Sequence, residues 1–342
     1  MLLKRSERPV MGIQPIVVAG DSHTWGQGSG GERAMGLPLA AGELRPMGFG
    51  FPSYVNLLRE RLERSTGSKA TEFDGKALAS LAGISLQGES ALLQKPGDCL
   101  RLPKAELYRV VFQGREESSL AEVRLDGRPY AAVPLTMPKS DYMYRLCPVL
   151  CEPGGGEAEL CCLKGSVLIY RVEAYTGPFA VINSGLGSCP LSRYLLPEVW
   201  DSWVKAWHPA AVIAEGNTIN DWLAQETPEE YERLLVQEIN MIRMMGAQPF
   251  LHTVAPILGS QDMPYSPVRY PRLVETVRQV ARQEQVPFAD ANQEMKQKLA
   301  VLSEQEGAAL LFSDPWHPNA QGHCIYAQSL FELISPFLFE LV

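Results

Sequence analysis

Short, largely apolar runs alternate with helical patterns along most of this chain, and this rhythm limits the fold more than any other feature. Apolar runs without polar alternation are typical of strands that are covered on both faces. Strands separated by helices favour a parallel sheet with helices packed on either side. The predicted strands cover about 16–19, 179–182, 211–214, 249–254 and 286–289.

Helix signals fill the intervals between these runs. Gly67 marks the end of the first predicted helix, and Thr227-Pro228-Glu229-Glu230 is a capping box with proline at the first helical position. Apolar residues recur at helical spacing in each predicted segment. The predicted helices cover about 54–62, 231–242, 273–281 and 320–333.

The stretch 71–178 has a different character, because it carries short β-type runs and no long helical pattern. Asp126-Gly127 is a strong hairpin turn signal within it. We therefore predict an all-β sandwich domain inserted into an α/β domain that comprises 10–70 and 179–342. The predicted strands of the insert are 107–112, 121–125, 144–150, 159–163 and 167–172.

Charge and hydropathy exclude some classes of function. The 342 residues carry a formal net charge of −8 and contain no long basic run, so nucleic acid is not an expected partner. No apolar stretch reaches the roughly 18 residues that suggest a membrane span. The first nine residues lack a continuous apolar segment, so we predict no signal peptide and a cytoplasmic location, although a chain trimmed of its leader would look the same.

Seven cysteines are present, and four of them cluster: Cys147, Cys151, Cys161 and Cys162. Cys-x3-Cys followed by Cys-Cys resembles a zinc site, but the region lacks histidine and the usual Cys-x2-Cys spacing. We favour the alternative that these are buried thiols in strands, and we expect no metal.

Serine, histidine and aspartate stand in motifs that follow the predicted strands. Ser22 lies in Gly20-Asp21-Ser22-His23, directly after the first apolar run, where open α/β folds bind their ligands. Asp314 and His317 are three residues apart, so both side chains can face one partner. A hydroxyl, an imidazole and a carboxylate supply a nucleophile, its base and the group that orients the base. Taken singly, each motif has a plain alternative: a loop serine, or an aspartate that caps the last helix.

Two further motifs can supply hydrogen-bond donors to an oxyanion. Gly187 follows the second strand, and its N–H can approach a ligand closely; Gly185 and Ser188 are the competing candidates. Asn220 follows the third strand and precedes Asp221, with Asn217 as its rival. Turn formation is the alternative role for these residues.

In this order the motifs resemble those of the SGNH, or GDSL-type, hydrolases, a family of esterases and lipases. The matching positions are Ser22, Gly187, Asn220 and His317, and 314–323 is especially similar to the last block of the family. The resemblance covers about 10–66 and 179–340. It implies a flavodoxin-like three-layer sandwich with a five-stranded parallel sheet, a Ser22–His317–Asp314 triad, and an oxyanion hole formed by Ser22, Gly187 and Asn220.

The sequence departs from the family pattern at two places. Thr218 stands where the family has glycine, two residues before the asparagine, and the second block is one residue shorter than usual. Both departures concern the oxyanion hole rather than the triad. The inserted β domain resembles the jelly-roll accessory domains of some carbohydrate-acting members.

Three of the six tryptophans, Trp25, Trp222 and Trp316, lie within three residues of a proposed catalytic position. Aromatic faces suit sugar rings and acyl chains, so we predict that they bind substrate, with ordinary packing as the alternative.

Together these features predict a serine esterase that removes a short acyl group, acetyl by preference, from a carbohydrate. It would act on a small-molecule or oligosaccharide ester and need no cofactor. A lipase, lysophospholipase or acyltransferase with the same triad is the second hypothesis. A non-catalytic glycan-binding protein on a relict esterase fold is the third. The oligomeric state stays open, with a homo-oligomer as one alternative.

Overall fold

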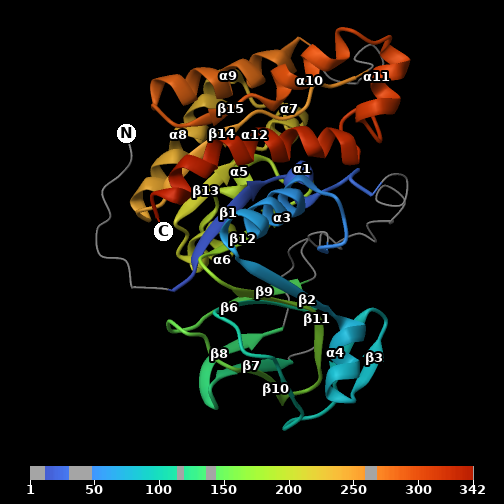
Figure 1. Cartoon of the computed structure of the whole chain (residues 1–342), viewed down its shortest axis with the longest axis vertical. Helices are drawn as coiled ribbons and strands as arrows, with labels where there is room; N and C mark the ends of the chain where they lie inside the picture. The colour runs from blue at the N-terminus through green and yellow to red at the C-terminus, as the bar shows by residue number, and fades with distance from the viewer. Residues whose placement is uncertain (1–11, 31–47, 114–118, 136–143, 259–267, 342) are drawn as a thin grey trace.

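A five-stranded parallel sheet organises the molecule, as the apolar runs predicted (Figure 1). The computed structural model describes residues 12–30, 48–113, 119–135, 144–258 and 268–341. Neighbouring strands follow the order β12-β1-β13-β14-β15, and every pair in the sheet is parallel. The strands are β1 (Gln14–Gly20), β12 (Phe179–Gly185), β13 (Ala211–Ala214), β14 (Gln248–His252) and β15 (Phe288–Ala289).

Helices cover both faces of this sheet, which gives three layers. Successive residues of a strand point to opposite faces, and β1 shows this directly. Val17 and Ala19 join one hydrophobic cluster, with residues of α6, α8 and α9, whereas Ile16 and Val18 join another, with residues of α3 and α12. The helices of the first face are α5 (Leu191–Tyr194), α6 (Pro197–Trp203), α7 (Thr218–Leu223), α8 (Pro228–Met244) and α9 (Arg269–Gln283). Those of the second are α3 (Tyr54–Thr66), α10 (Ala291–Leu299), α11 (Glu304–Leu311) and α12 (Ala320–Phe339).

Local capping explains where several helices begin and end. Ser53 caps α3 by accepting from Asn56 N, and Gly67 ends it in the left-handed conformation with φ 74°. Thr227 and Glu230 form the predicted capping box of α8, with both reciprocal hydrogen bonds present. The capping signals at both helices are therefore confirmed.

Residues 69–176 form two antiparallel sheets that share one hydrophobic cluster. We call this segment the β region. The four-stranded sheet has the order β5 (Cys99–Arg101), β10 (Ala158–Lys164), β7 (Leu120–Leu125) and β8 (Arg128–Pro134). The other has the order β3 (Ser85–Gln87), β4 (Ser90–Leu93), β11 (Val167–Thr176), β6 (Leu107–Gln113) and β9 (Tyr144–Leu150), with β2 (Lys69–Asp74) also paired to β11. The eight-residue helix α4 (Gly75–Ala82), capped by Asp74, was not predicted.

The β region joins the α/β core at the beginning of the parallel strands. Two residues connect β11 to β12, and Gln14 N at the start of β1 donates to Pro178 O. Leu107 and Tyr175 belong to the hydrophobic cluster of the α/β core. Figure 1 shows the β region at one end of the molecule and α1, which follows β1, toward the other.

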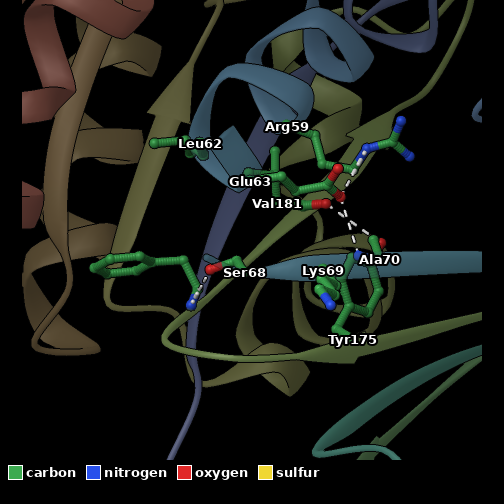
Figure 2. A pocket seen from close by; sticks show the side chains of 9 residues that line it. Arg59, Leu62, Glu63, Ser68, Lys69, Ala70, Tyr175 and Val181 are labelled. Atoms are coloured by element: carbon green, nitrogen blue, oxygen red, sulfur yellow. Dashed lines mark hydrogen bonds and ion pairs between the residues drawn. The ribbon is translucent and has the colours of Figure 1, made fainter. Parts of the chain in front are cut away.

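Ion pairs at this junction are almost completely buried. Glu173 lies 3.3 Å from Arg109 and 3.1 Å from Arg171, and the three side chains are at most 3% exposed. A small pocket beside them lies between α3, β2 and β12, where Glu63 accepts from Ala70 N and Ser68 accepts from Phe179 N (Figure 2). This pocket belongs to the junction and contains none of the residues that follow the parallel strands.

One cysteine departs from the expectation of free buried thiols. Cys161 forms a disulfide with Cys99, which lies directly opposite it on the neighbouring strand, whereas Cys147, Cys151 and Cys162 are buried free thiols. Burial raises the pKa of the Cys147 thiol to about 12. Disulfides are rare in cytosolic proteins, so the Cys99–Cys161 bond does not favour the cytoplasmic location.

None of the helices in the described ranges combines the length and the apolar character needed to cross a bilayer.

Glu238 of α8 is a buried carboxyl whose ionisation should weaken the fold. It is 1% exposed, its Oε2 has no hydrogen-bond partner, and burial together with the charge of Glu215 raises its pKa from 4.5 to about 8. Between these two values the carboxyl keeps its proton in the folded protein and loses it in the unfolded chain. Stability contributed by this group therefore falls as the pH rises from about 4.5 to about 8.

We predict that Glu238→Gln stabilises the protein at alkaline pH, because the amide cannot ionise. Thermal unfolding should show a Tm higher than wild type by about 2 °C or more at pH 8 and little changed at pH 5. The exposed Glu229→Gln, in the first turn of the same helix, is the control and should not show this difference. A Glu238→Gln gain at pH 5 as large as at pH 8 would contradict the ionisation argument.

Candidate active site

Ser22 begins a four-residue helix, α1 (Ser22–Trp25), at the carboxyl end of β1. Asp21 caps this helix by accepting from His23 N at 3.0 Å. The helix packs tightly on the neighbouring strand, because a Cβ at Gly185 would lie 2.1 Å from Trp25 N. Glycine at this position is therefore what lets Ser22 come so close to the end of β12.

Ser22, His317 and Asp314 form one chain of hydrogen bonds. Ser22 Oγ lies 2.9 Å from His317 Nε2, and His317 Nδ1 lies 2.8 Å from Asp314 Oδ2. A carboxylate accepts, so Nδ1 carries the ring proton and the serine hydroxyl donates to Nε2. Residues 295 positions apart in the sequence thus meet with the geometry that a nucleophile and its base require.

A tight turn holds Asp314 and His317 together. Asp314 Oδ1 accepts from Trp316 N at 2.7 Å and from His317 N at 2.8 Å. Burial alone would raise the pKa of Asp314, but the hydrogen bond and charge of His317, with these two backbone donors, leave it below its ordinary value. Asp314 is therefore an anion at neutral pH.

Gly28 lets the chain after α1 pass close to this turn. Its φ is +87°, and a Cβ there would lie 2.5 Å from Pro318 O and 3.0 Å from His317 Cβ. Ser313 Oγ donates to Gly28 O at 2.6 Å and links the two segments. Sequence analysis did not single out Gly28, because its contact is with residues almost 300 positions away.

Asn220 lies beside the segment that carries Ser22. Its Nδ2 donates to Asp21 Oδ2 at 2.7 Å, and a primary amide has a second N–H available for another acceptor. The rival Asn217 is buried, and its Nδ2 donates to Cys189 O at 2.7 Å. Thr218, which replaces the glycine of the family, exchanges a hydrogen bond with Tyr231 of α8 at 2.8 Å.

The three candidates for the second oxyanion donor differ in their surroundings. Gly185 N donates to Asn183 Oδ1 at 3.0 Å and is thus already engaged. Ser188 is exposed, with φ +56°, whereas Gly187 is buried in the loop between them. Of the three, Gly187 best fits a donor that faces an enclosed site.

The predicted substrate tryptophans are mostly core residues. Trp222 is 0% exposed and packs edge-on against Tyr270 and Trp316, and Trp25 is 4% exposed. Trp222 therefore presents no surface to a substrate, and packing explains its position better than binding. Trp316 alone of the three is half-buried, immediately before His317.

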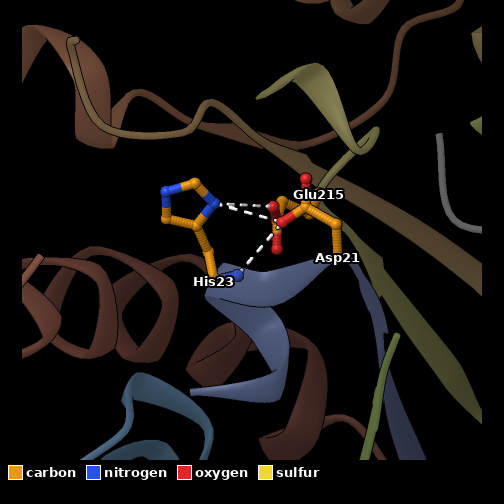
Figure 3. Close-up of side chains that lie close together, drawn as sticks. All are labelled: Asp21, His23 and Glu215. Atoms are coloured by element: carbon orange, nitrogen blue, oxygen red, sulfur yellow. Dashed lines mark hydrogen bonds and ion pairs between the residues drawn. The ribbon is translucent and has the colours of Figure 1, made fainter. Parts of the chain in front are cut away.

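A buried charged group, missed by sequence analysis, lies directly behind Ser22. His23 Nδ1 is 3.1 Å from Asp21 Oδ1 and 3.4 Å from Glu215 Oε1, and all three side chains are 0% exposed (Figure 3). Burial would lower the pKa of His23, yet its two carboxyl neighbours raise it well above 6.5. Burial and the Asp21 charge raise the pKa of Glu215 to about 8. His23 is thus a cation and Glu215 a neutral acid at pH 7.

These three side chains are also the one group in the described ranges whose His, Asp and Glu atoms lie close enough to hold a metal, within 4.8 Å of one another. Their separations are those of hydrogen bonds, and Asp21 already accepts from His23 and Asn220. A protonated imidazole cannot donate a lone pair to a metal. The donor set therefore fits an ion pair better than a metal centre.

The other histidines take no part in the hydrogen-bonded chain that links Ser22, His317 and Asp314. Burial lowers the pKa of His252 to about 4 and that of His323 to about 3, so both are neutral. His323 accepts from Tyr54 N at 3.2 Å and is structural. His208 is exposed in a loop.

A five-stranded parallel sheet with Ser22, Gly187 and Asn220 beyond the carboxyl ends of its strands is an α/β hydrolase fold. Residues 167–325 match the GDSL-like Lipase/Acylhydrolase family. This match bears out the resemblance seen in the sequence and supports a carboxylic ester hydrolase. The match includes Gly187, Asn220, Asp314 and His317, whereas Ser22 lies before it, separated by the β region.

One solved structure supports the fold. A peptidoglycan O-acetylesterase superposes with a TM-score of 0.54 at 16% identity, covering 97% of this chain and 93% of that one. An acetylxylan esterase from Geobacillus stearothermophilus aligns with 46% of this chain and 73% of its own, at 23% identity and a TM-score of 0.39. The search of curated proteins found no match.

We predict that Gly28→Ala lowers kcat/KM about 10- to 100-fold, because the new Cβ pushes the His317 turn away from Ser22. Gly97→Ala is a matched control, since Gly97 has φ +92° and no atom near its would-be Cβ. Both variants carry the strain of a positive φ, roughly 1–2 kcal/mol, and only the first displaces the turn. Equal losses of activity in the two would show that strain alone is responsible.

Proposed function

We propose that the chain hydrolyses esters through a Ser22–His317–Asp314 triad. The observation that carries the proposal is the unbroken hydrogen-bonded series from the Ser22 hydroxyl through the His317 ring to the Asp314 carboxylate. Asp314 is held ionised, so it can stabilise the imidazolium that forms when His317 takes the serine proton.

The reaction has two steps with these residues. Ser22 Oγ attacks the ester carbonyl while His317 Nε2 takes its proton, and the N–H groups of Ser22 and Gly187 and the Asn220 amide stabilise the oxyanion. His317 then protonates the leaving alcohol, which departs from an acyl-enzyme. Water gives its proton to His317, attacks the acyl carbonyl and releases the acid, and the proton returns to Ser22.

The substrate proposed is a short acyl ester, acetyl by preference, on a carbohydrate. Ser22 and His317 are 4% and 6% exposed, so little room is open around the nucleophile, which favours a small acyl group. Trp316, next to His317, supplies an aromatic face for a sugar ring. The solved acetylesterase with a similar fold makes acetylated glycans the first substrates to test.

We also propose that residues 71–178 form an inserted β-sandwich accessory domain, with the catalytic domain made of 10–70 and 179–342. The shared hydrophobic cluster of the two antiparallel sheets supports this division. The β region joins the core at the beginning of the parallel strands, whereas Ser22 follows the end of β1. The described strands of the β region would therefore bind a glycan away from the triad and would not form a wall of the active site.

Ser22→Ala should abolish turnover of p-nitrophenyl acetate and leave Tm unchanged, because the covalent step needs the hydroxyl. A fluorophosphonate should label one peptide of the wild type, the one that contains Ser22, as shown by mass mapping. Ser202→Ala, in an exposed turn of α6, is the control and should keep full activity. Turnover by Ser22→Ala at the wild-type rate would end the triad assignment.

Acyl-chain length should separate the leading substrate hypothesis from its rival. We expect kcat/KM for p-nitrophenyl acetate to exceed that for the octanoyl ester, because the nearly closed site leaves little space beside Ser22. A clear preference for octanoyl would instead favour a lipase, lysophospholipase or acyltransferase with the same triad.

A further inference from the structure

His23 contacts an acceptor at each ring nitrogen. Nε2 lies 2.8 Å from the backbone oxygen of Trp316, and a carbonyl oxygen can only accept. Nδ1 faces Asp21 Oδ1 at 3.1 Å and Glu215 Oε1 at 3.4 Å. The Trp316 carbonyl and the ionised Asp21 can only accept, so each ring nitrogen donates and the ring is doubly protonated and cationic.

The neighbours of His23 offset the free-energy cost of burying its positive charge. Asp21 supplies one full negative charge, and its pKa is held below the ordinary value by the hydrogen bonds and charge of His23 despite its burial. Glu215 keeps its proton, and Thr24 N donates to its Oε2 at 3.0 Å. One cation, one anion and one neutral acid leave the group with no net charge in the core, which is the condition for burying charges.

The Trp316 carbonyl connects this group to the base of the reaction. Trp316 is the residue before His317, and the N–H of the peptide unit that joins them, His317 N, is already bound to Asp314 Oδ1. The peptide unit at this point of the turn is thus held from both sides, by Asp314 and by His23. The two imidazole rings are close, with centroids 5.4 Å apart.

We propose that His23 is a positioning residue: a buried imidazolium that ties the Asp314–His317 turn to the segment that carries Ser22. The proposal rests on the triad function above and adds a residue to it. His23 follows Ser22 directly, so one short segment presents the nucleophile on one side and anchors the base on the other. The same anion, Asp21, holds the Asn220 amide at 2.7 Å, so the oxyanion donor and the base share one support.

Two amide variants separate the two bonds of the ring. The amide nitrogen of asparagine occupies the place of Nδ1, and that of glutamine the place of Nε2. His23→Asn therefore keeps the bond to Asp21 and loses the one to Trp316 O, whereas His23→Gln keeps the bond to Trp316 O. Both variants lose the positive charge.

We expect His23→Asn to lower kcat about 10- to 100-fold with KM changed less than about threefold, because the base is misplaced while substrate contacts stay. His23→Gln should stay within about fivefold of the wild-type kcat. His208→Asn, at an exposed left-handed position, is the control and should be fully active. Equal losses of kcat in the Asn and Gln variants would overturn the proposal, because charge or packing alone would then account for them.

If a variant fails to fold, a measurement on the wild-type protein still tests the proposal. With ¹⁵N-histidine labelling, the His23 ring should show both nitrogens protonated at pH 7.5, where a neutral ring shows one. The signals are assigned by their absence from His23→Gln, or by their cross-peaks to the neighbouring Tyr326 ring, 6.5 Å away. A singly protonated ring would overturn the proposal.

Other outcomes distinguish this proposal from the function on which it rests. Loss of turnover in Ser22→Ala with full activity in His23→Asn would reject the role of His23 and keep the triad. Turnover in Ser22→Ala would reject the triad itself. Activity lost to a chelator and restored by a divalent cation would overturn the ion-pair assignment, because it would make Asp21, His23 and Glu215 metal ligands.

Discussion

The site depends on the parallel register of β1 with β12 and β13. Parallel strands end at the same edge of a sheet, and here Gly20 pairs with Gly185 while Ala19 pairs with Ala214. The residues that follow these strands must therefore meet, whatever their distance in the sequence. Ser22, Gly187 and Glu215 come from three such strand ends. The closing partner, His317, comes from the segment before α12, which packs against α3 over the same sheet.

Sequence patterns predicted the parts of the structure that local chemistry determines. Each parallel strand was marked by a short, largely apolar run, and Gly67 and Thr227-Pro228-Glu229-Glu230 marked helix ends through contacts within a few residues. The spacing of Asp314 and His317 indicated that both could face one partner, and their positions in one turn bear out that contact. These features depend on contacts between residues that are close together in the sequence.

What was missed depends on partners far away in the chain. Cys99 pairs with Cys161 across two strands of the β region, 62 positions apart, and nothing near either residue indicates this. Glu215 follows an apolar strand and looks like a loop residue until His23 is placed against it. Trp222 stands two residues after Asn220, yet the helical rotation of α7 turns it into the core. Proximity in sequence to a catalytic candidate is thus weak evidence for contact with substrate.

The topology also explains how the β region can lie between β1 and β12 in the chain without reaching the catalytic candidates. A helix that connects parallel strands runs back from the carboxyl edge of the sheet to the amino edge. α3 does this: Tyr54, at its start, receives a contact from Thr24 near Ser22, and its last residues lead into β2 of the β region. A segment inserted between such a helix and the next strand leaves and re-enters the core at the amino edge. Leu107 and Tyr175, which pack in the hydrophobic cluster of the α/β core, can then fasten the β region there without reaching the carboxyl ends that carry the catalytic candidates.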